Sequence, residues 1–97
     1  MAKAYWMTFY HSIKNPSALA DYAKLAGPAI EAGGGRMLVR GVPAEVHEKG
    51  LKERVVMIEF PSLAHAKNTH DGPAYQAALK VLGDAVERDM RFVEGLA

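Results

Sequence analysis

Residues 55–62 read Val-Val-Met-Ile-Glu-Phe-Pro-Ser, and this stretch carries the strongest strand signal in the chain. β-Branched and aromatic side chains favour a strand, Pro61 ends it, and Ser62 is a preferred N-cap for a following helix. Apart from Glu59, both alternating sets of positions in residues 55–60 are apolar. A strand that is apolar on both sides is covered on both sides, so we expect this strand to lie inside the fold.

Residues 4–13 form a second predicted strand with the same two-sided character. One alternating set carries Tyr5, Met7 and Phe9, and the other carries Trp6 and Tyr10. Shorter strands are predicted for residues 36–40 and 89–94, and residues 44–48 are a candidate for a short edge strand.

The first helix is predicted to begin at Asn15-Pro16, because asparagine is a preferred N-cap and proline suits the first helical position. Pro28 lies inside its apolar stripe, which predicts a kink or a stop and restart there. The three glycines at 33–35 end this helix.

The second helix is predicted to begin after Ser62 and to be broken at residues 70–73, His-Asp-Gly-Pro, where the same signals restart it. Its second part carries an apolar stripe that extends from Tyr75 to Val86. The next predicted element is the strand at residues 89–94.

This order predicts an α+β fold: a ferredoxin-like sandwich in which two helices cover one face of an antiparallel sheet. Residues 1–97 then form a single domain, as expected at this length. Two helices leave the second apolar face of the sheet uncovered. A second copy of the chain would cover it, which predicts a homodimer of the dimeric α+β barrel type.

Composition excludes several classes of protein. A net charge of +1 argues against a nucleic-acid binder, and no apolar run approaches the roughly 20 residues that span a bilayer. The chain has no cysteine, which excludes disulfides and thiolate chemistry. Residues 1–6 have the pattern of a strand rather than of a secretory signal, so a cytoplasmic location is expected.

The chain resembles the domain-of-unknown-function 1330 family, small bacterial proteins of the dimeric α+β barrel type. The resemblance covers almost the whole chain and depends on an ordered set of short motifs: Tyr5-Trp6, Tyr22, Gly27-Pro28-Ala29, Gly34-Gly35-Arg36, Arg40-Gly41, Glu45-Val46, residues 55–62 and Tyr75-Gln76-Ala77. It implies the fold and the homodimer and brings no established reaction. Proteins of the same barrel type include cofactor-independent monooxygenases and lactone isomerases, and that similarity is one of fold.

Two stretches depart from the family pattern. The family usually places an aromatic residue before a Ser-Pro-Glu-Tyr stretch, whereas this chain reads Asn-Thr-His-Asp-Gly-Pro-Ala-Tyr at residues 68–75. It also tends to follow its Arg-Gly pair with a second glycine, where this chain has Val42. A family pocket wall near residues 68–75 would therefore be changed here.

Glu59 is the first candidate for a catalytic residue, because burial in an apolar strand raises the pKa of a carboxyl towards that of a useful acid or base. Alternatively, an arginine holds it for structural reasons, or it is exposed at a barrel rim. Arg36, Arg40 and Arg54 are candidates for binding an anionic ligand, since a guanidinium donates two parallel hydrogen bonds to a carboxylate. Arg40 is the best of the three because it stands at a strand end, before Gly41. The alternative is a solvated arginine or one paired with a nearby glutamate.

His70, in the helix break, and His11, near the end of the first strand, are candidate proton carriers; alternatively, both lie on the surface. The spacing of the histidines does not suit a metal ion, so none is expected. The aromatic side chains are candidates for the wall of a pocket for a flat apolar ligand, or for simple core: Trp6, Tyr10, Tyr22 and Tyr75.

Two hypotheses of function follow. The first is a homodimer whose pocket, between sheet and helices, binds a small organic molecule. Any chemistry would be cofactor-independent proton transfer or oxidation, with Glu59 as acid or base, Arg40 as anion anchor, and His11 or His70 assisting. The second is a non-catalytic module that binds a ligand or acts under stress. A titrating group with a shifted pKa in the pocket would favour the enzyme.

Overall fold

Four antiparallel strands form one sheet in the order β2-β3-β1-β4. The computed structural model describes residues 2–96; Met1 and Ala97, which the predicted single domain includes, lie outside this range. The elements follow one another as β1 (Ala4–Ile13), α1 (Pro16–Ala32), β2 (Arg36–Gly41), β3 (Val55–Phe60), α2 (Leu63–Asp71), α3 (Pro73–Leu82) and β4 (Val86–Glu94).

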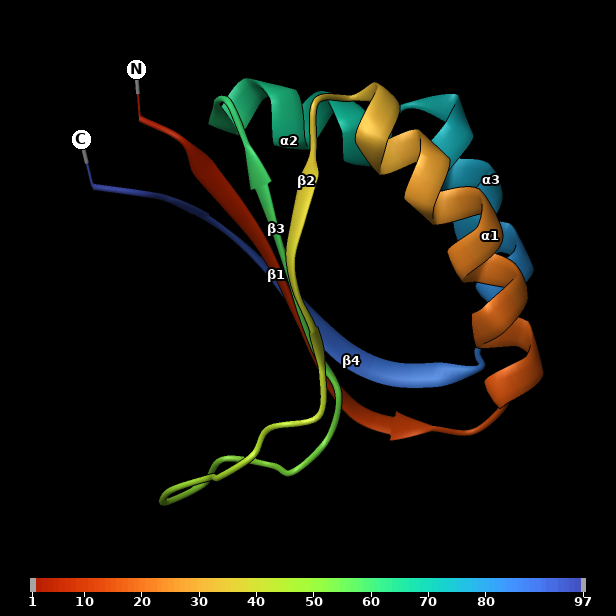
Figure 1. Cartoon of the computed structure of the whole chain (residues 1–97). Helices are drawn as coiled ribbons and strands as arrows, with labels where there is room; N and C mark the ends of the chain where they lie inside the picture. The colour runs from red at the N-terminus through yellow and green to blue at the C-terminus, as the bar shows by residue number, and fades with distance from the viewer. Residues whose placement is uncertain (1, 97) are drawn as a thin grey trace.

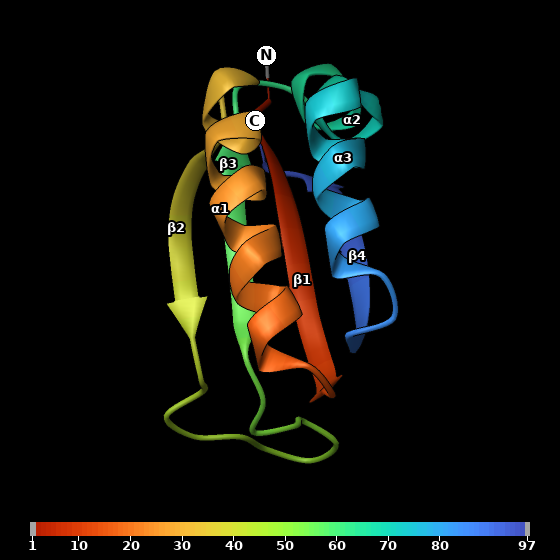
Figure 2. The same ribbon diagram turned by 90° about the vertical axis from the view of Figure 1, so that its right-hand side faces the viewer.

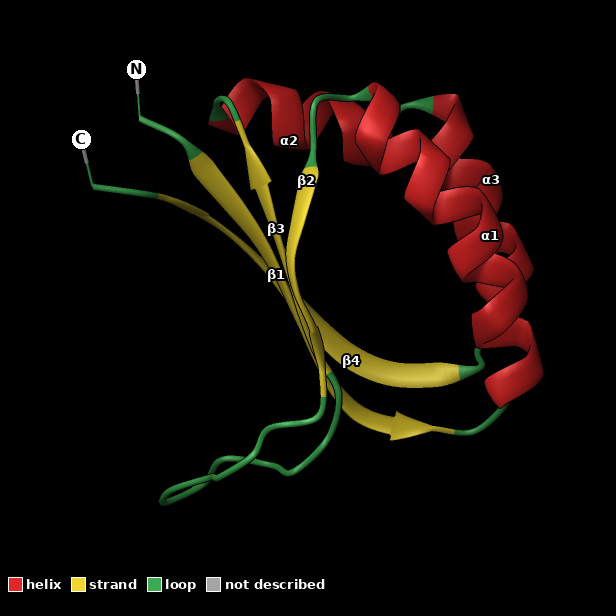
Figure 3. Cartoon of the chain, viewed as in Figure 1, coloured by secondary structure: helices red, strands yellow, loops and turns green. Residues whose placement is uncertain are grey.

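All the helices lie on one side of the sheet, and the other side is open (Figures 1 and 3). Figure 2 looks onto the helices and shows α1 and α3 side by side in front of the sheet. This arrangement confirms the predicted α+β ferredoxin-like fold. The second predicted helix forms two separate helices, because Gly72 takes an extended conformation and Pro73 begins α3.

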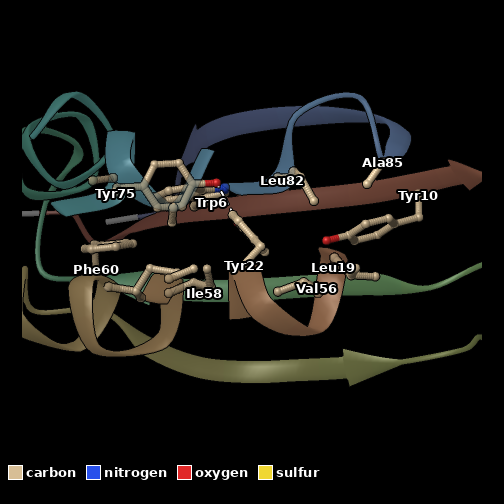
Figure 4. Close-up of a cluster of buried hydrophobic side chains, with 14 residues drawn as sticks. Trp6, Tyr10, Leu19, Tyr22, Val56, Ile58, Phe60, Tyr75, Leu82 and Ala85 are labelled. Carbon is tan, nitrogen blue, oxygen red and sulfur yellow. Dashed lines mark hydrogen bonds between the residues drawn. The ribbon is translucent and has the colours of Figure 1, made fainter. Parts of the chain in front are cut away.

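Strand pairing decides which side chains face the helices. β1 pairs with β3 so that Trp6 lies opposite Ile58 and Ala4 opposite Phe60. These side chains are fully buried beneath the helices with Tyr75 of α3, and they form the centre of the core (Figure 4). The alternate set on β1 and β3, which includes Met7 and Met57, is only partly buried because it faces the open side.

Local signals placed the helix starts correctly. The Asn15 side chain accepts a hydrogen bond from the backbone N–H of Ala18 at 3.1 Å, and Ser62 accepts one from His65 at 3.2 Å. α1 continues through Pro28, so the predicted stop and restart does not occur. Proline has a helical φ and costs the helix one hydrogen bond, and Gly27 has no Cβ to crowd the proline ring.

Two predicted boundaries were wrong. Residues 44–48 form no strand and lie in a loop that extends past the end of the sheet on the side away from the helices (Figure 1). Glu48 has a positive φ of 53°, which interrupts an extended chain. β4 begins at Val86, three residues before the predicted strand, because Gly83 with φ 55° ends α3 and removes Val86 from the predicted helical stripe.

None of the helices within residues 2–96 is long and apolar enough to cross a membrane.

Candidate ligand-binding site

A narrow pocket of about 60 Å³ lies between α1 and the helix-facing side of the sheet. Its walls combine small and apolar residues of α1 with aromatic and basic side chains. The aromatic and basic part of the wall consists of Trp6, Tyr10, Tyr22, Arg40, Arg54 and Arg88.

Arg88 is the centre of this wall. β4 places it directly opposite Tyr10 of β1, on the side of the sheet that faces the helices. Its Nη1 donates hydrogen bonds to the hydroxyl oxygens of Tyr10 at 3.1 Å and Tyr22 at 3.4 Å, and its Nη2 donates to that of Tyr75 at 3.4 Å. The guanidinium also lies over the rings of Tyr10 and Tyr22, 5.6 and 5.1 Å from their centroids. Three phenols from three elements therefore hold one cation in place.

Helix α1, which covers the pocket, contacts α3 through a tyrosine of each helix. The hydroxyls of Tyr22 on α1 and Tyr75 on α3 are 2.6 Å apart, and Figure 4 shows the two side chains approaching each other within the core. Burial, followed by the neighbouring Tyr22, raises the pKa of Tyr75 well above its ordinary value. Tyr75 is therefore a neutral hydrogen-bonding group at neutral pH.

Positive charge in the wall is not balanced by carboxylates. Among the described residues, no Asp or Glu lies within ion-pair distance of Arg40, Arg54 or Arg88, and none lines the pocket. Burial by itself lowers the pKa of Arg88, but the tyrosines around it, Tyr22 first, raise that pKa above its ordinary value. Arg88 therefore stays a cation inside the protein.

Two hydrogen-bond donors in the wall have no acceptor within the described part of the chain. They are Nε1 of Trp6, a residue that is 1% exposed, and Nε of Arg54. Buried donors almost always have a hydrogen-bond partner, so an unpaired one indicates an acceptor, water or ligand, that the chain itself does not supply. Both atoms are donors, and they would be satisfied by an acceptor such as a carboxylate or carbonyl oxygen.

The predicted ligand-binding residues lie together. Trp6, Tyr10 and Arg40 line the pocket. Tyr75 does not line it but accepts a hydrogen bond from Arg88, which does. The sequence prediction missed Arg88, because the last strand was expected to begin only at Asp89. Because β4 begins at Val86, Arg88 belongs to the same alternating set as Met90 and Phe92, which pack against the core. A basic residue among these apolar positions was the sequence signal that could have identified Arg88.

Glu59 lies across the sheet from this pocket. Its carboxylate is on the open side, where it accepts hydrogen bonds from the Arg36 guanidinium at 3.3 Å and from the Tyr5 hydroxyl at 3.4 Å. It also forms an ion pair with the Lys3 ammonium at 3.5 Å. This geometry matches the alternative in which an arginine holds the carboxylate, and its catalytic role stays a prediction.

The two candidate histidines lie apart from each other and outside the pocket wall. The Nδ1 atom of His70 is 2.9 Å from the carboxylate of Asp71, and its ring packs 5.5 Å from that of Trp6. His11 contacts Asp89 at 2.9 Å on the open side of the sheet. The hydrogen bond from His11, together with that from Arg91, lowers the pKa of Asp89. The predicted roles of both histidines in proton transfer stay predictions.

Within residues 2–96, no three His, Asp or Glu side chains gather in an arrangement that could hold a metal ion.

Comparison with known proteins gives a family and a fold. The family model described as "Domain of unknown function (DUF1330)" matches residues 3–96, which confirms the resemblance seen in the sequence. No protein of curated function matches the chain.

Three solved structures illustrate the similarity of fold. Methylated RPA0582 protein of Rhodopseudomonas palustris is 20% identical, with a TM-score of 0.78 over 99% of this chain and 82% of that one. A dimeric ferredoxin-like protein of unknown function from Jannaschia sp. CCS1 is 12% identical, with a TM-score of 0.66 over 96% and 99%. SnoaB, a cofactor-independent oxygenase from Streptomyces nogalater, is 8% identical, with a TM-score of 0.63 over 100% and 96%.

Proposed function

Because this chain belongs to the DUF1330 family, whose function is unknown, we propose a function from the pocket itself: the protein binds a small organic anion there. The anion would accept hydrogen bonds from the guanidinium groups of Arg54 and Arg88 and from the indole N–H of Trp6. The aromatic walls would contact its apolar part.

The observation that carries the proposal is Arg88, a partly buried cation with no carboxylate partner among the described residues. Removing a guanidinium even in part from water has a free-energy cost, which neutral phenols offset only in part. A carboxylate would add charge-assisted hydrogen bonds, which are roughly twice as strong as neutral ones. The pocket therefore favours an anion over a neutral molecule of the same shape.

The ionisable residues of the pocket wall favour binding over acid–base catalysis. They are tyrosines and arginines, and the pKa of Arg88 lies above its ordinary value, so it does not exchange a proton near neutral pH. Glu59, His11 and His70 lie outside the wall. This favours the non-catalytic binding module of the two hypotheses.

A second candidate is cofactor-independent oxygenation, the activity by which SnoaB is described; in this protein the substrate would be acidic. Arg88 and its three phenols support it, because a fixed cation and neutral donors stabilise an enolate or phenolate. In this case the substrate would be ionised before or during binding. Oxygen consumption with such a substrate, lost in Arg88→Met, would support this candidate, and binding without consumption would oppose it.

We also propose that the protein acts as a homodimer in which a second copy covers the open side of the sheet. This side carries partly buried apolar side chains on its two central strands: Tyr5, Met7, Phe9, Val55 and Met57. A contiguous apolar face of this kind marks an interface, and a second identical sheet is complementary to it.

Trp6 supplies the direct test, since it is the only tryptophan in the sequence and lies in the pocket wall. Its fluorescence would be titrated with butanoate and with butanamide, a neutral molecule of nearly the same shape. Butanoate should bind at least about tenfold more tightly, because a charged hydrogen bond contributes roughly 1.5–3 kcal/mol.

Arg88→Met should remove this preference, and Lys67→Met should keep it, because Lys67 is an exposed cation on α2 away from the pocket. Equal affinity for the two molecules in the unsubstituted protein would refute the proposal. A preference that survives in Arg88→Met would also refute it.

A further inference from the structure

A second hollow adjoins the pocket along the edge of the fold and shares part of its lining. This groove has a volume of about 670 Å³ and lies between α1 and the edge strand β2. Figure 2 shows that β2 runs beside α1 rather than behind it. The pocket and the groove share four residues, which form the mouth between them: Gly27, Ile30, Met37 and Arg40.

The sizes of the two hollows divide the ligand into two parts. A dry cavity of roughly 150 Å³ is known to hold a benzene ring, and the inner pocket is well under half that size at about 60 Å³. It has room for a carboxylate and one or two carbons, but not for a ring. Anything larger attached to the carboxylate must extend through the mouth into the groove.

The groove is mainly apolar along the part that adjoins the mouth. Pro28 and Ile30 of α1 line it on one side, and Met37 and Leu38 of β2 line it on the other. Met37 and Leu38 are 42% and 40% exposed, so their apolar side chains are accessible from the groove. Arg40 stands at the mouth, where its charge attracts anions.

We propose that the ligand is a monocarboxylate with a slender, unbranched apolar tail. This inference rests on the proposed function and adds the ligand's shape and orientation. The carboxylate lies in the inner pocket on Arg54 and Arg88, where the unpaired Nε of Arg54 gains an acceptor. The tail passes the mouth beside Gly27 and lies in the groove between α1 and β2.

Gly27 lies at the mouth through which the tail passes in this orientation. A Cβ at Gly27 would meet nothing within 4 Å beyond its chain neighbours, so there is open space where a side chain would project. Pro28 restricts the residue before it, and glycine relieves that restriction. Replacing Pro28 by alanine removes the restriction, and a leucine at position 27 would then fill the space at the mouth.

The test compares Gly27→Leu/Pro28→Ala with its matched control Pro28→Ala. Affinities for butanoate, hexanoate and octanoate would be measured by Trp6 fluorescence, together with hexanedioate as a dicarboxylate of the same length as hexanoate. In the unsubstituted protein and in Pro28→Ala, affinity should rise about two- to fourfold per methylene, the upper value being that of full burial. In Gly27→Leu/Pro28→Ala this dependence on length should disappear.

The outcomes separate this inference from the proposed function. A preference for butanoate over butanamide, with equal affinity from butanoate to octanoate, would overturn the inference and leave the proposed function standing. Tighter binding of hexanedioate than of hexanoate would also overturn it. Binding of no carboxylate would refute the proposed function itself.

Thermal unfolding would check that the double variant folds. If it does not, Met37→Trp provides a second obstruction, from the β2 side of the mouth, with affinities measured by calorimetry because the added tryptophan would contribute to the fluorescence. An unchanged dependence on tail length in a folded variant with an obstructed mouth would overturn the inference.

Discussion

The buried Tyr75 hydroxyl predicts that the protein loses stability in alkali. Tyr75 is fully buried. Its hydroxyl oxygen lies 2.6 Å from the hydroxyl oxygen of Tyr22 and accepts a hydrogen bond from Nη2 of Arg88 at 3.4 Å. Its pKa in the folded protein lies above the ordinary value of 10.0 because burial disfavours the phenolate. The unfolded chain then releases this proton near pH 10 while the folded protein retains it. The stability due to Tyr75 is therefore present below about pH 10 and is lost as the pH rises further.

The magnitude follows from linkage. At pH 11 the free energy of unfolding falls by about 1.4 kcal/mol relative to pH 9, because the unfolded phenol is then about 90% ionised. Tyr75→Phe has no such loss. At neutral pH this variant should be less stable by about 1 kcal/mol, the typical net value of one hydrogen bond, since Tyr22 keeps its bond from Arg88. The two stabilities should therefore become equal between about pH 10 and 11.

The assay is urea unfolding of both proteins at pH 7, 9, 10 and 11, at one fixed protein concentration because the proposed dimer makes stability depend on it. All other ionisable groups are common to the two proteins, so the difference between the two stabilities isolates Tyr75. A difference that stays constant from pH 9 to pH 11 would refute the reasoning, because it would mean that the Tyr75 hydroxyl ionises equally in folded and unfolded protein.

Three further predictions concern other parts of the molecule. Met57→Glu, on the open side opposite Met7, should weaken the proposed dimer at least about 100-fold in sedimentation velocity, because the interface would bury two unpaired carboxylates. The control Val81→Glu, at an exposed position of α3, should leave the dimer intact, and an unchanged dimer in Met57→Glu would refute the face-to-face arrangement. Gly35→Ala should destabilise the fold by about 1–3 kcal/mol in urea unfolding, because the new Cβ would lie 2.8 Å from the Phe60 ring and 2.9 Å from the Ile30 carbonyl oxygen. Gly41→Ala, where the Cβ would have open space around it, is the control, and equal stability of the two variants would contradict this packing. Asp89 has a lowered pKa, so its contribution to stability is present above about pH 4 and is lost as the pH falls through the pKa of the folded protein. The free energy of unfolding of Asp89→Asn should therefore differ from that of the unsubstituted protein at pH 6 and approach it in acid, and a difference that widens in acid would contradict the lowered pKa.

Much of the fold could be predicted from short stretches of sequence. Asn15 and Ser62 cap their helices as expected, because a cap depends on a side chain and backbone groups within three residues of it. The break before Pro73 is equally local. The loop at residues 44–48 was less predictable, because an edge strand forms only where a neighbouring strand is available for pairing, and neighbours depend on the whole fold.

The candidate site could be predicted only in part. Aromatic residues at Trp6, Tyr10 and Tyr75 were expected to line a pocket, because large aromatic side chains gather where helices cover a sheet. Arg88 was missed because its position depends on the start of β4. The face of Glu59 could not be decided either, since both alternating sets on β3 are apolar enough to be buried.

The sequence by itself determined which segments become strands and helices and that the central strands need cover on both sides. Periodicity, caps and breakers act within a few residues, and the family resemblance extends these patterns along the chain. Only the tertiary structure decided which side of the sheet the helices cover, and with it that Glu59 faces away from the pocket while Arg88 faces into it. The same arrangement places Arg88 beside the Tyr10 hydroxyl, 78 residues away in the chain. The contact depends on strand pairing and on helix packing between distant segments, which a local sequence pattern does not specify.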